Sequence, residues 1–203
     1  MSPVSSSVSC SAWRSEGGVA TLDAMSALQP YRFSRAEFER MVEFGAFEDL
    51  PVELLDGVLV EVTAQGPPHA SVIRALMNLL APLVAENRLD VQMPLATDEW
   101  SLPEPDLAIT ERTAVGHPAA AELAVEVVVT QRAVARYKAR IYAAAGVPEY
   151  WIVDVPGRTV DVLTGPARAG YRERRALSGD DRLELPAHGI GTTVAELFAS
   201  AGL

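Results

Sequence analysis

Apolar residues recur along the chain with two different periods, and the changes of period outline the expected helices and strands. Helical spacing begins after Ser34 and Glu37, which have the separation of a capping box. A second, strongly amphipathic segment follows the Pro67-Pro68 loop, with apolar residues at intervals of three and four. The pattern predicts helices over residues 35–44, 69–83, 133–145 and 193–199, the third of them ended by Gly146.

Short apolar runs separated by turn residues predict a series of strands. The dipeptide Asp56-Gly57 between two such runs is a strong hairpin signal. Residues 123–129 form a nearly continuous β-branched run, which is typical of a central strand buried on both faces. The strands that we expect are 52–55, 58–62, 89–95, 106–110, 123–129, 150–153, 159–163, 170–176 and 182–185. Because helices alternate with these strands, the chain is predicted to have an α/β (α+β) fold with a mixed central β-sheet flanked by helices.

Residues 1–28 differ from the rest of the chain because they are rich in Ser, Gly and Ala and have no hydrophobic period. We expect a disordered leader over residues 1–28 and a single domain over residues 29–203. No apolar run reaches the roughly 18 residues of a membrane span. The one cysteine, Cys10, excludes an internal disulfide and fits a reducing compartment, and the N-terminus lacks the pattern of a secretory signal. These features predict a cytoplasmic protein.

The net charge of −10 argues against broad, non-specific binding to a phosphate backbone. It does not exclude a metal-dependent nuclease, because such sites gather acidic residues around a divalent cation. The cations are themselves unusual, since Lys138 is the one lysine beside sixteen arginines. Either Lys138 lies by chance on a solvated helix face, or a site requires a compact ammonium that arginine cannot supply.

Three acidic residues are placed where a carboxylate can carry chemistry. Glu126 interrupts the apolar run 123–129, so it is expected to be paired, neutralised or bound to a metal, unless it reaches solvent at the strand end or pairs with a core arginine. Asp106 follows a proline and Glu53 precedes the hairpin, and each taken alone is equally consistent with a turn or a solvent-facing position. Together they offer oxygen ligands for Mg²⁺ or Mn²⁺, with Lys138 on the following helix to act on an attacking water or on the phosphate.

The sequence resembles the Uma-type restriction endonuclease family of the PD-(D/E)xK nuclease superfamily from about Tyr31 to Phe198. The most distinctive part runs from Lys138 through the segment Tyr142 to Asp154. The other carrying segments are Glu53 to Val60, Pro67-Pro68-His69, Pro105-Asp106-Leu107 and Val194 to Phe198.

The resemblance implies a restriction-endonuclease-like core and hydrolysis of DNA phosphodiester bonds with Mg²⁺ or Mn²⁺. It implies that Glu53, Asp106 and Glu126 are the metal ligands. It also implies that Lys138 is the catalytic lysine, placed on the helix after the strand that bears Glu126. The more usual position of that lysine, on the strand two residues after Glu126, is occupied by Val128. By analogy with nucleases that cut two strands with two subunits, a homodimer is expected.

The chain departs from the family pattern between the strand and the helix. The segment Val129-Thr130-Gln131 replaces a Ser-Pro-Ser type of sequence, and Val134 replaces an aspartate one turn before the lysine, while arginines recur along the helix at 132, 136 and 140. These changes and the negative charge keep open an alternative function, a catalytically impaired nuclease fold that binds a nucleic acid or a protein.

Two further residues near the predicted site have structural interpretations of their own. His69 opens the second helix, where a histidine is more often solvated than functional. Tyr142 lies one turn after Lys138 on the same helix face, and we expect it mainly to pack against the sheet.

Overall fold

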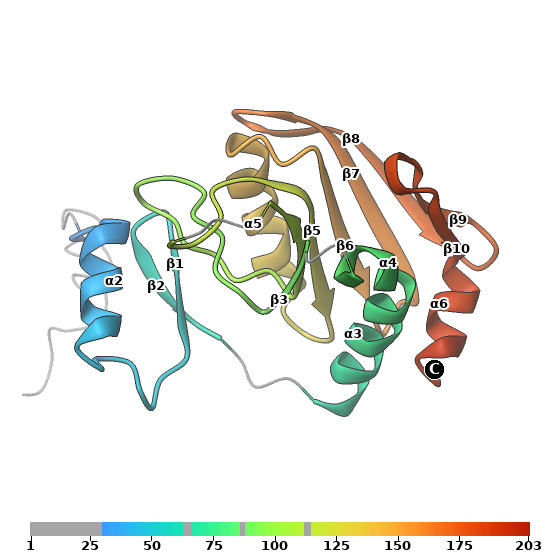
Figure 1. Cartoon of the computed structure of the whole chain (residues 1–203), viewed down its shortest axis with the longest axis horizontal. Coiled ribbons are helices and arrows are strands. Elements are labelled where there is room, and N and C mark those ends of the chain that lie inside the picture. The colour runs from blue at the N-terminus through green and yellow to red at the C-terminus, as the bar shows by residue number, and fades with distance from the viewer. Residues whose placement is uncertain (1–29, 63–65, 86–87, 112–114) are drawn as a thin grey trace, which may run out of the picture. The chain divides into compact units, whose positions relative to one another are not determined.

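A mixed six-stranded sheet organises the unit formed by Arg32–Leu203 in the computed structural model (Figure 1). The structure describes residues 30–62, 66–85, 88–111 and 115–203, so the predicted leader of residues 1–28 lies outside the described residues. The strands of the sheet are β3 (Leu89–Val91), β4 (Leu107–Thr110), β5 (Ala121–Val128), β6 (Glu149–Asp154), β7 (Thr159–Ala167) and β8 (Gly170–Ser178). This mixed sheet with flanking helices is the fold class that the sequence predicts.

The strands lie in sequence order across the sheet, and one neighbouring pair is parallel. Strand β5 pairs in parallel with β6, and every other pair in this sheet is antiparallel. A parallel pair needs a crossover connection, which helix α5 (Arg132–Ala144) provides between β5 and β6. The side chains of β5 alternate between the two faces of the sheet, so Ala124, Glu126 and Val128 share the face that α5 covers.

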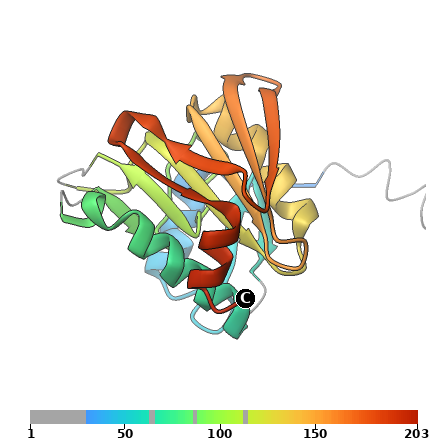
Figure 2. The ribbon, with the colours of Figure 1, turned by 90° about the vertical axis from the view of Figure 1, so that its right-hand side faces the viewer.

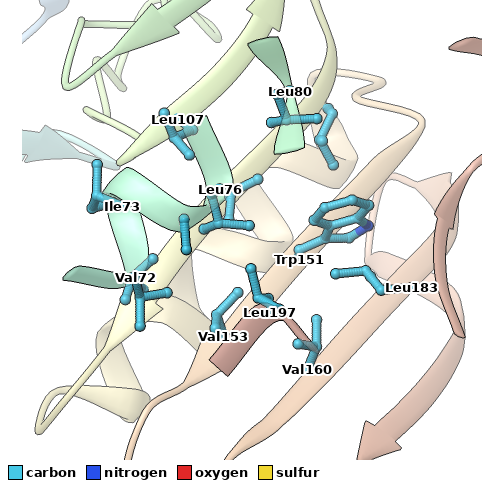
Figure 3. Close-up of a cluster of buried hydrophobic side chains, with 14 of the residues drawn as sticks. Val72, Ile73, Leu76, Leu80, Leu107, Trp151, Val153, Val160, Leu183 and Leu197 are labelled. Carbon is cyan, nitrogen blue, oxygen red and sulfur yellow. The ribbon is translucent and has the colours of Figure 1, made fainter. Parts of the chain in front are cut away.

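Helices cover both faces of the sheet (Figure 2). Helix α5 packs on one face, where Ala135 and Tyr142 meet Tyr150 and Ile152 of β6. Helices α3 (Pro67–Leu79), α4 (Ala81–Ala85) and α6 (Val194–Ser200) are on the other face. Figure 3 shows the larger core cluster there, in which side chains from α3 and α6 surround Trp151 and its sheet neighbours. The two apolar layers fix the central strands, and with them the polar residues at the strand ends.

A separate hairpin and helix pack beside the sheet. Strands β1 (Val52–Leu55) and β2 (Val58–Glu61) are joined by the predicted Asp56-Gly57 turn, and α2 (Arg35–Glu43) begins with the predicted capping box. A small core of Phe38, Leu54, Ala96 and Leu102 holds these elements to the loop between β3 and β4. At the C-terminal side lie β9 (Arg182–Leu185), the 3₁₀ turn η1 (Pro186–His188) and β10 (Ile190–Thr193).

Some predicted boundaries differ from the observed ones. The strand expected over residues 89–95 ends at Val91, because Gln92 adopts a positive φ of 49° that breaks the extended backbone. The helix expected over residues 69–83 divides at Leu80 into α3 and α4, since Pro82 lies in the first turn of a new helix. Strand β10 has no counterpart in the prediction. No helix in the described residues is long and apolar enough to cross a membrane.

Candidate active site

Three of the four predicted site residues meet at one point beneath α5. The ammonium of Lys138 lies 2.7 Å from Oε2 of Glu53 and 2.9 Å from Oε1 of Glu126. These residues come from α5, β1 and β5, three elements that are distant in the sequence. The fourth, Asp106, lies at the entry to β4, the strand that pairs with β5.

Lys138 is buried on the sheet-facing side of α5, with 3% of its side chain exposed. It shares that face with Ala135 and Tyr142, three residues before it and four after it, which pack on β5 and β6. Besides the two carboxylates, Nζ donates to the backbone carbonyl of Glu104 at 3.3 Å. An ammonium has three N–H donors, and three acceptors surround this one. The solvated-face interpretation of the lone lysine is therefore wrong.

Glu126 points under α5, and its side chain is 12% exposed. Its Oε1 accepts hydrogen bonds from the Lys138 ammonium at 2.9 Å and from the Tyr142 hydroxyl at 3.0 Å. Among the described side chains, both bonds that Glu126 accepts fall on this oxygen, which leaves Oε2 for a cation or for water. Tyr142 packs in the core as expected, and it also orients the central carboxylate.

Asp106 is a buried carboxylate fixed from two sides. Its Oδ2 accepts a hydrogen bond of 2.8 Å from the backbone N–H of Val127, the residue after Glu126. Its Oδ1 lies 3.0 Å from Nε2 of His69, at the start of α3. The side chain of Asp106 thus bridges the strand that bears Glu126 and the helix on the opposite face of the sheet.

His69 is the residue that the sequence-based prediction undervalued, because its side chain is 2% exposed rather than solvated. A signal for its burial is present in the sequence. Val72, Ile73 and Leu76 follow it at intervals of three, four and seven and form the buried stripe of α3, so His69 begins that stripe. The helix starts at Pro67, and its first turn directs His69 at Asp106.

Burial and the surrounding charges change the acidity of the site. Burial raises the pKa of Glu126 to about 8; the Lys138 ammonium opposes this rise, and the carboxylates of Asp106 and Glu53 add to it. Burial lowers the pKa of Lys138, but the two glutamates outweigh it and hold that pKa above its ordinary value. With a pKa near 8, Glu126 keeps its proton at neutral pH in the metal-free site, and a cation bound beside it would favour the ionised form.

A cavity of about 240 Å³ opens onto this charged centre. Glu53, Glu126 and Lys138 contribute to its wall, and the rest is formed by the hairpin and by the segment that joins β5 to α5. Buried carboxylates at the wall of a cavity can be reached by a small ion or by an ester oxygen of a substrate.

The expected set of three metal ligands is not gathered around one point. Among the residues that the structure describes, no three His, Cys, Asp or Glu side chains are grouped so that they could hold a metal ion. The ammonium of Lys138 lies between Glu53 and Glu126. The remaining pair of carboxylates, Asp106 and Glu126, offers hard oxygen donors of the kind that Mg²⁺ and Mn²⁺ prefer.

A comparison with known protein families identifies the family of this chain. The model of the Uma2 family, described as "Putative restriction endonuclease", matches residues 35–195. The chain belongs to this family.

A solved structure shares the fold of this Uma2 family member. It is the crystal structure of "a putative nuclease belonging to DUF820" from Anabaena variabilis. The superposition has a TM-score of 0.65 and covers 83% of this chain and 99% of the nuclease chain. The identity is 16%, so the likeness shows the fold alone. No curated protein matches the chain.

The departures from the family pattern lie at the wall of the cavity. Val129, Thr130, Gln131 and Val134 line it together with the hairpin. They do not displace the charged centre, where Lys138 keeps its contacts with Glu53 and Glu126. The changes therefore remove the aspartate expected at position 134, but they leave the contacts among Glu53, Glu126 and Lys138 intact.

The hairpin that carries Glu53 is also tied to α5 by a polar contact outside the cavity. The carboxylate of Asp56 in the hairpin turn accepts a hydrogen bond of 2.6 Å from the Tyr137 hydroxyl and pairs with the guanidinium of Arg140. Both partners flank Lys138 on the helix. This contact and the Glu53–Lys138 pair thus hold the same two elements together.

Proposed function

We propose that this protein is a metal-dependent endonuclease that hydrolyses DNA phosphodiester bonds. The observation that carries the proposal is the contact of Lys138 with Glu126 at the wall of a cavity, in a member of a restriction endonuclease family. Carboxylates and a lysine in one place are the groups that metal-assisted phosphodiester hydrolysis requires.

In this proposal Asp106 and Glu126 hold Mg²⁺ or Mn²⁺. A divalent cation held there would supply an activated water and would offset the charge that develops on the phosphate. The backbone N–H of Val127 keeps Asp106 in place, and His69 lies 3.0 Å from its other oxygen. Tyr142 and Lys138 keep Glu126 in place. These contacts support the proposal, because donors that are already held in place lower the cost of organising them around a cation.

Lys138 supplies the fixed positive charge beside the reacting phosphate. Its ammonium is a compact donor that can turn from a carboxylate to a phosphate oxygen without moving the helix. Glu53 has both oxygens within 2.9 Å of this ammonium, so we assign it the role of orienting Lys138 rather than that of a third metal ligand. This assignment keeps Glu53 in the site and changes its partner.

A cleavage assay tests the proposal. Supercoiled plasmid, linear duplex, single-stranded DNA and RNA are each incubated with the full-length protein and millimolar Mg²⁺ or Mn²⁺, or with chelator. We expect metal-dependent cleavage of DNA that falls by about two orders of magnitude or more in Glu126→Gln and Lys138→Met, as for the loss of other groups that stabilise a transition state.

The controls are Glu39→Gln and Arg74→Met, which change side chains outside the cavity. Cleavage that survives unchanged in Glu126→Gln contradicts the site. Binding of DNA without cleavage under any of these conditions supports instead the alternative of a catalytically impaired binding module.

Two further predictions accompany the nuclease proposal. We expect two subunits to associate when both strands of a duplex are cut, which light scattering of the protein with and without DNA can test. We also expect the protein to act in the cytoplasm, which fractionation of the source cells can test.

A further inference from the structure

Positive charge is concentrated in one part of this acidic chain. The segment from Arg132 to Arg175 contains nine of the 17 Lys and Arg residues and four of the 27 Asp and Glu residues. It forms α5 and the strands β6, β7 and most of β8. The remainder of the chain is therefore more negative than the net charge of −10 suggests.

Three of these arginines form a stripe along α5. Arg132, Arg136 and Arg140 follow each other at intervals of four, so they lie along one side of the helix. Arg136 and Arg140 are exposed, whereas Lys138 between them is buried on the sheet side. The first arginine of the stripe comes directly after Gln131 of the cavity wall. The last pairs with Asp56 of the hairpin that carries Glu53.

The stripe continues onto β8 through a shared acid. Asp161 on β7 accepts from Nη2 of Arg132 at 3.1 Å and from Nη2 of Arg174 at 2.8 and 2.9 Å. Arg172 lies two residues before Arg174 on β8, and it too is exposed. Helix α5 packs against β7 and β8, so the two groups of arginines are neighbours.

One acid of this region, Asp161, lies beneath the guanidinium groups. The side chain of Asp161 is 3% exposed, whereas that of Arg174 is 54% exposed. Arg174 contacts Asp161 through one nitrogen, so its other N–H donors face outward. At Arg174, an approaching molecule therefore meets a guanidinium that is held in position over a buried carboxylate. Guanidinium groups in such a row match the oxygens of a phosphodiester backbone.

We infer that the basic face formed by Arg132, Arg136, Arg140, Arg172 and Arg174 binds the phosphate backbone of duplex DNA. The inference rests on the proposed function, and it adds where the substrate lies. The DNA backbone would cross the outer side of α5 between β8 and the hairpin, so that one strand of the duplex reaches the cavity where Lys138 lies. The negative charge of the other surfaces disfavours their contact with DNA and so orients the duplex.

Fluorescence anisotropy with a labelled DNA duplex, in chelator and over a series of salt concentrations, tests the basic face without requiring cleavage. The test variant is Arg136→Glu/Arg172→Glu, which leaves the arginines that pair with buried Asp161 unchanged. The matched control is Arg74→Glu/Arg182→Glu, because both residues are exposed, lie on other elements, and give the same change of net charge. Circular dichroism confirms that each variant is folded.

We expect the test variant to bind DNA at least tenfold more weakly than the control. The slope of log affinity against log salt should fall by about one for each phosphate that the variant no longer binds. Equal weakening of binding in the two variants overturns the inference, as does tighter binding of duplex RNA through the same arginines. Wild-type protein that binds DNA through this face but does not cleave it retains the inference and contradicts the proposed function. If the wild-type protein cleaves DNA but the two variants bind DNA equally well, the proposed function stands and the inference of a basic face fails.

Discussion

The ammonium of Lys138 lies 2.7 Å from Oε2 of Glu53, which joins α5 to a strand 85 residues earlier in the chain. The same ammonium is 2.9 Å from Oε1 of Glu126, so one cation contacts two acidic side chains. A buried ion pair contributes little net stability as a pair, but removal of one partner leaves the other uncompensated. Lys138 is thus expected to matter for the fold as well as for catalysis.

Lys138→Met should lower the free energy of unfolding by about 3 kcal/mol, because the carboxylate of Glu53 would be buried without its cation. The double variant Glu53→Gln/Lys138→Met should recover part of that loss, since the uncompensated charge is then also removed. Urea denaturation measures both values. Arg74→Met, at an exposed site, is the control. If Lys138→Met loses no more stability than this control, the Glu53–Lys138 ion pair is not needed for the stability of the fold.

The pKa of Glu126 predicts a dependence of stability on pH. Burial raises this pKa from 4.5 to about 8, so between these values the folded state keeps a proton that the unfolded chain has released. The free energy of unfolding should therefore fall as the pH rises through this range, with a slope of at most about 1.4 kcal/mol per pH unit from this group. Denaturation in chelator at several pH values between these limits measures the slope.

Glu126→Gln is the control for this dependence, because a glutamine keeps the shape and cannot titrate. We expect its stability to vary less with pH than that of the wild type over the same range. The slope of Glu39→Gln should match that of the wild type. If Glu126→Gln and the wild type have the same slope, another group is responsible.

Much of the fold and of the candidate site follows from short-range patterns in the sequence. The run 123–129 predicts a central strand because its apolar side chains need burial on both faces, and this is where β5 lies. A charged residue within such a run requires a partner, and Lys138 provides one for Glu126. The sequence therefore indicates that these two residues are linked, although it does not give the contact itself.

Other features depend on contacts between distant residues and could not be predicted in this way. Nothing near Glu53 in the sequence shows that its carboxylate meets an ammonium 85 residues later rather than a metal. His69 was expected to be solvated because a helix start is usually exposed, but α3 packs its first turn against the sheet. Strand β10 is too short to show an apolar pattern of its own, and it is defined by its antiparallel pairing with β9.

Metal binding should stabilise the folded protein if Asp106 and Glu126 hold the cation. Saturating Mn²⁺ or Mg²⁺ raises the free energy of unfolding by about 2.7 kcal/mol at a metal concentration of roughly 100 times the dissociation constant. Thermal denaturation should therefore show a higher melting temperature with metal than with chelator. Asp106→Asn should lose most of this increase, and Glu39→Gln should retain it. An equal increase in both variants places the cation elsewhere.

The turn of the β1–β2 hairpin allows a matched pair of glycine substitutions. Gly57 and Gly146 both have a φ of 80°, which disfavours any side chain. A Cβ at Gly57 would lie 2.7 Å from Cβ of Arg32, whereas a Cβ at Gly146 would meet nothing within 4 Å. Gly146→Ala should therefore cost about 1 kcal/mol of stability from backbone strain alone, and Gly57→Ala about 2 kcal/mol or more.

The same pair of variants separates stability from activity. Gly57 anchors the turn, since its N–H donates to the carbonyl of Trp100 at 2.6 Å and its carbonyl accepts from the N–H of Phe33 at 2.9 Å. A clash there shifts the hairpin, and Glu53 shifts with it, away from Lys138. At a temperature where both variants are folded, Gly57→Ala should therefore cleave DNA more slowly than Gly146→Ala. Equal rates would mean that the hairpin does not position the lysine.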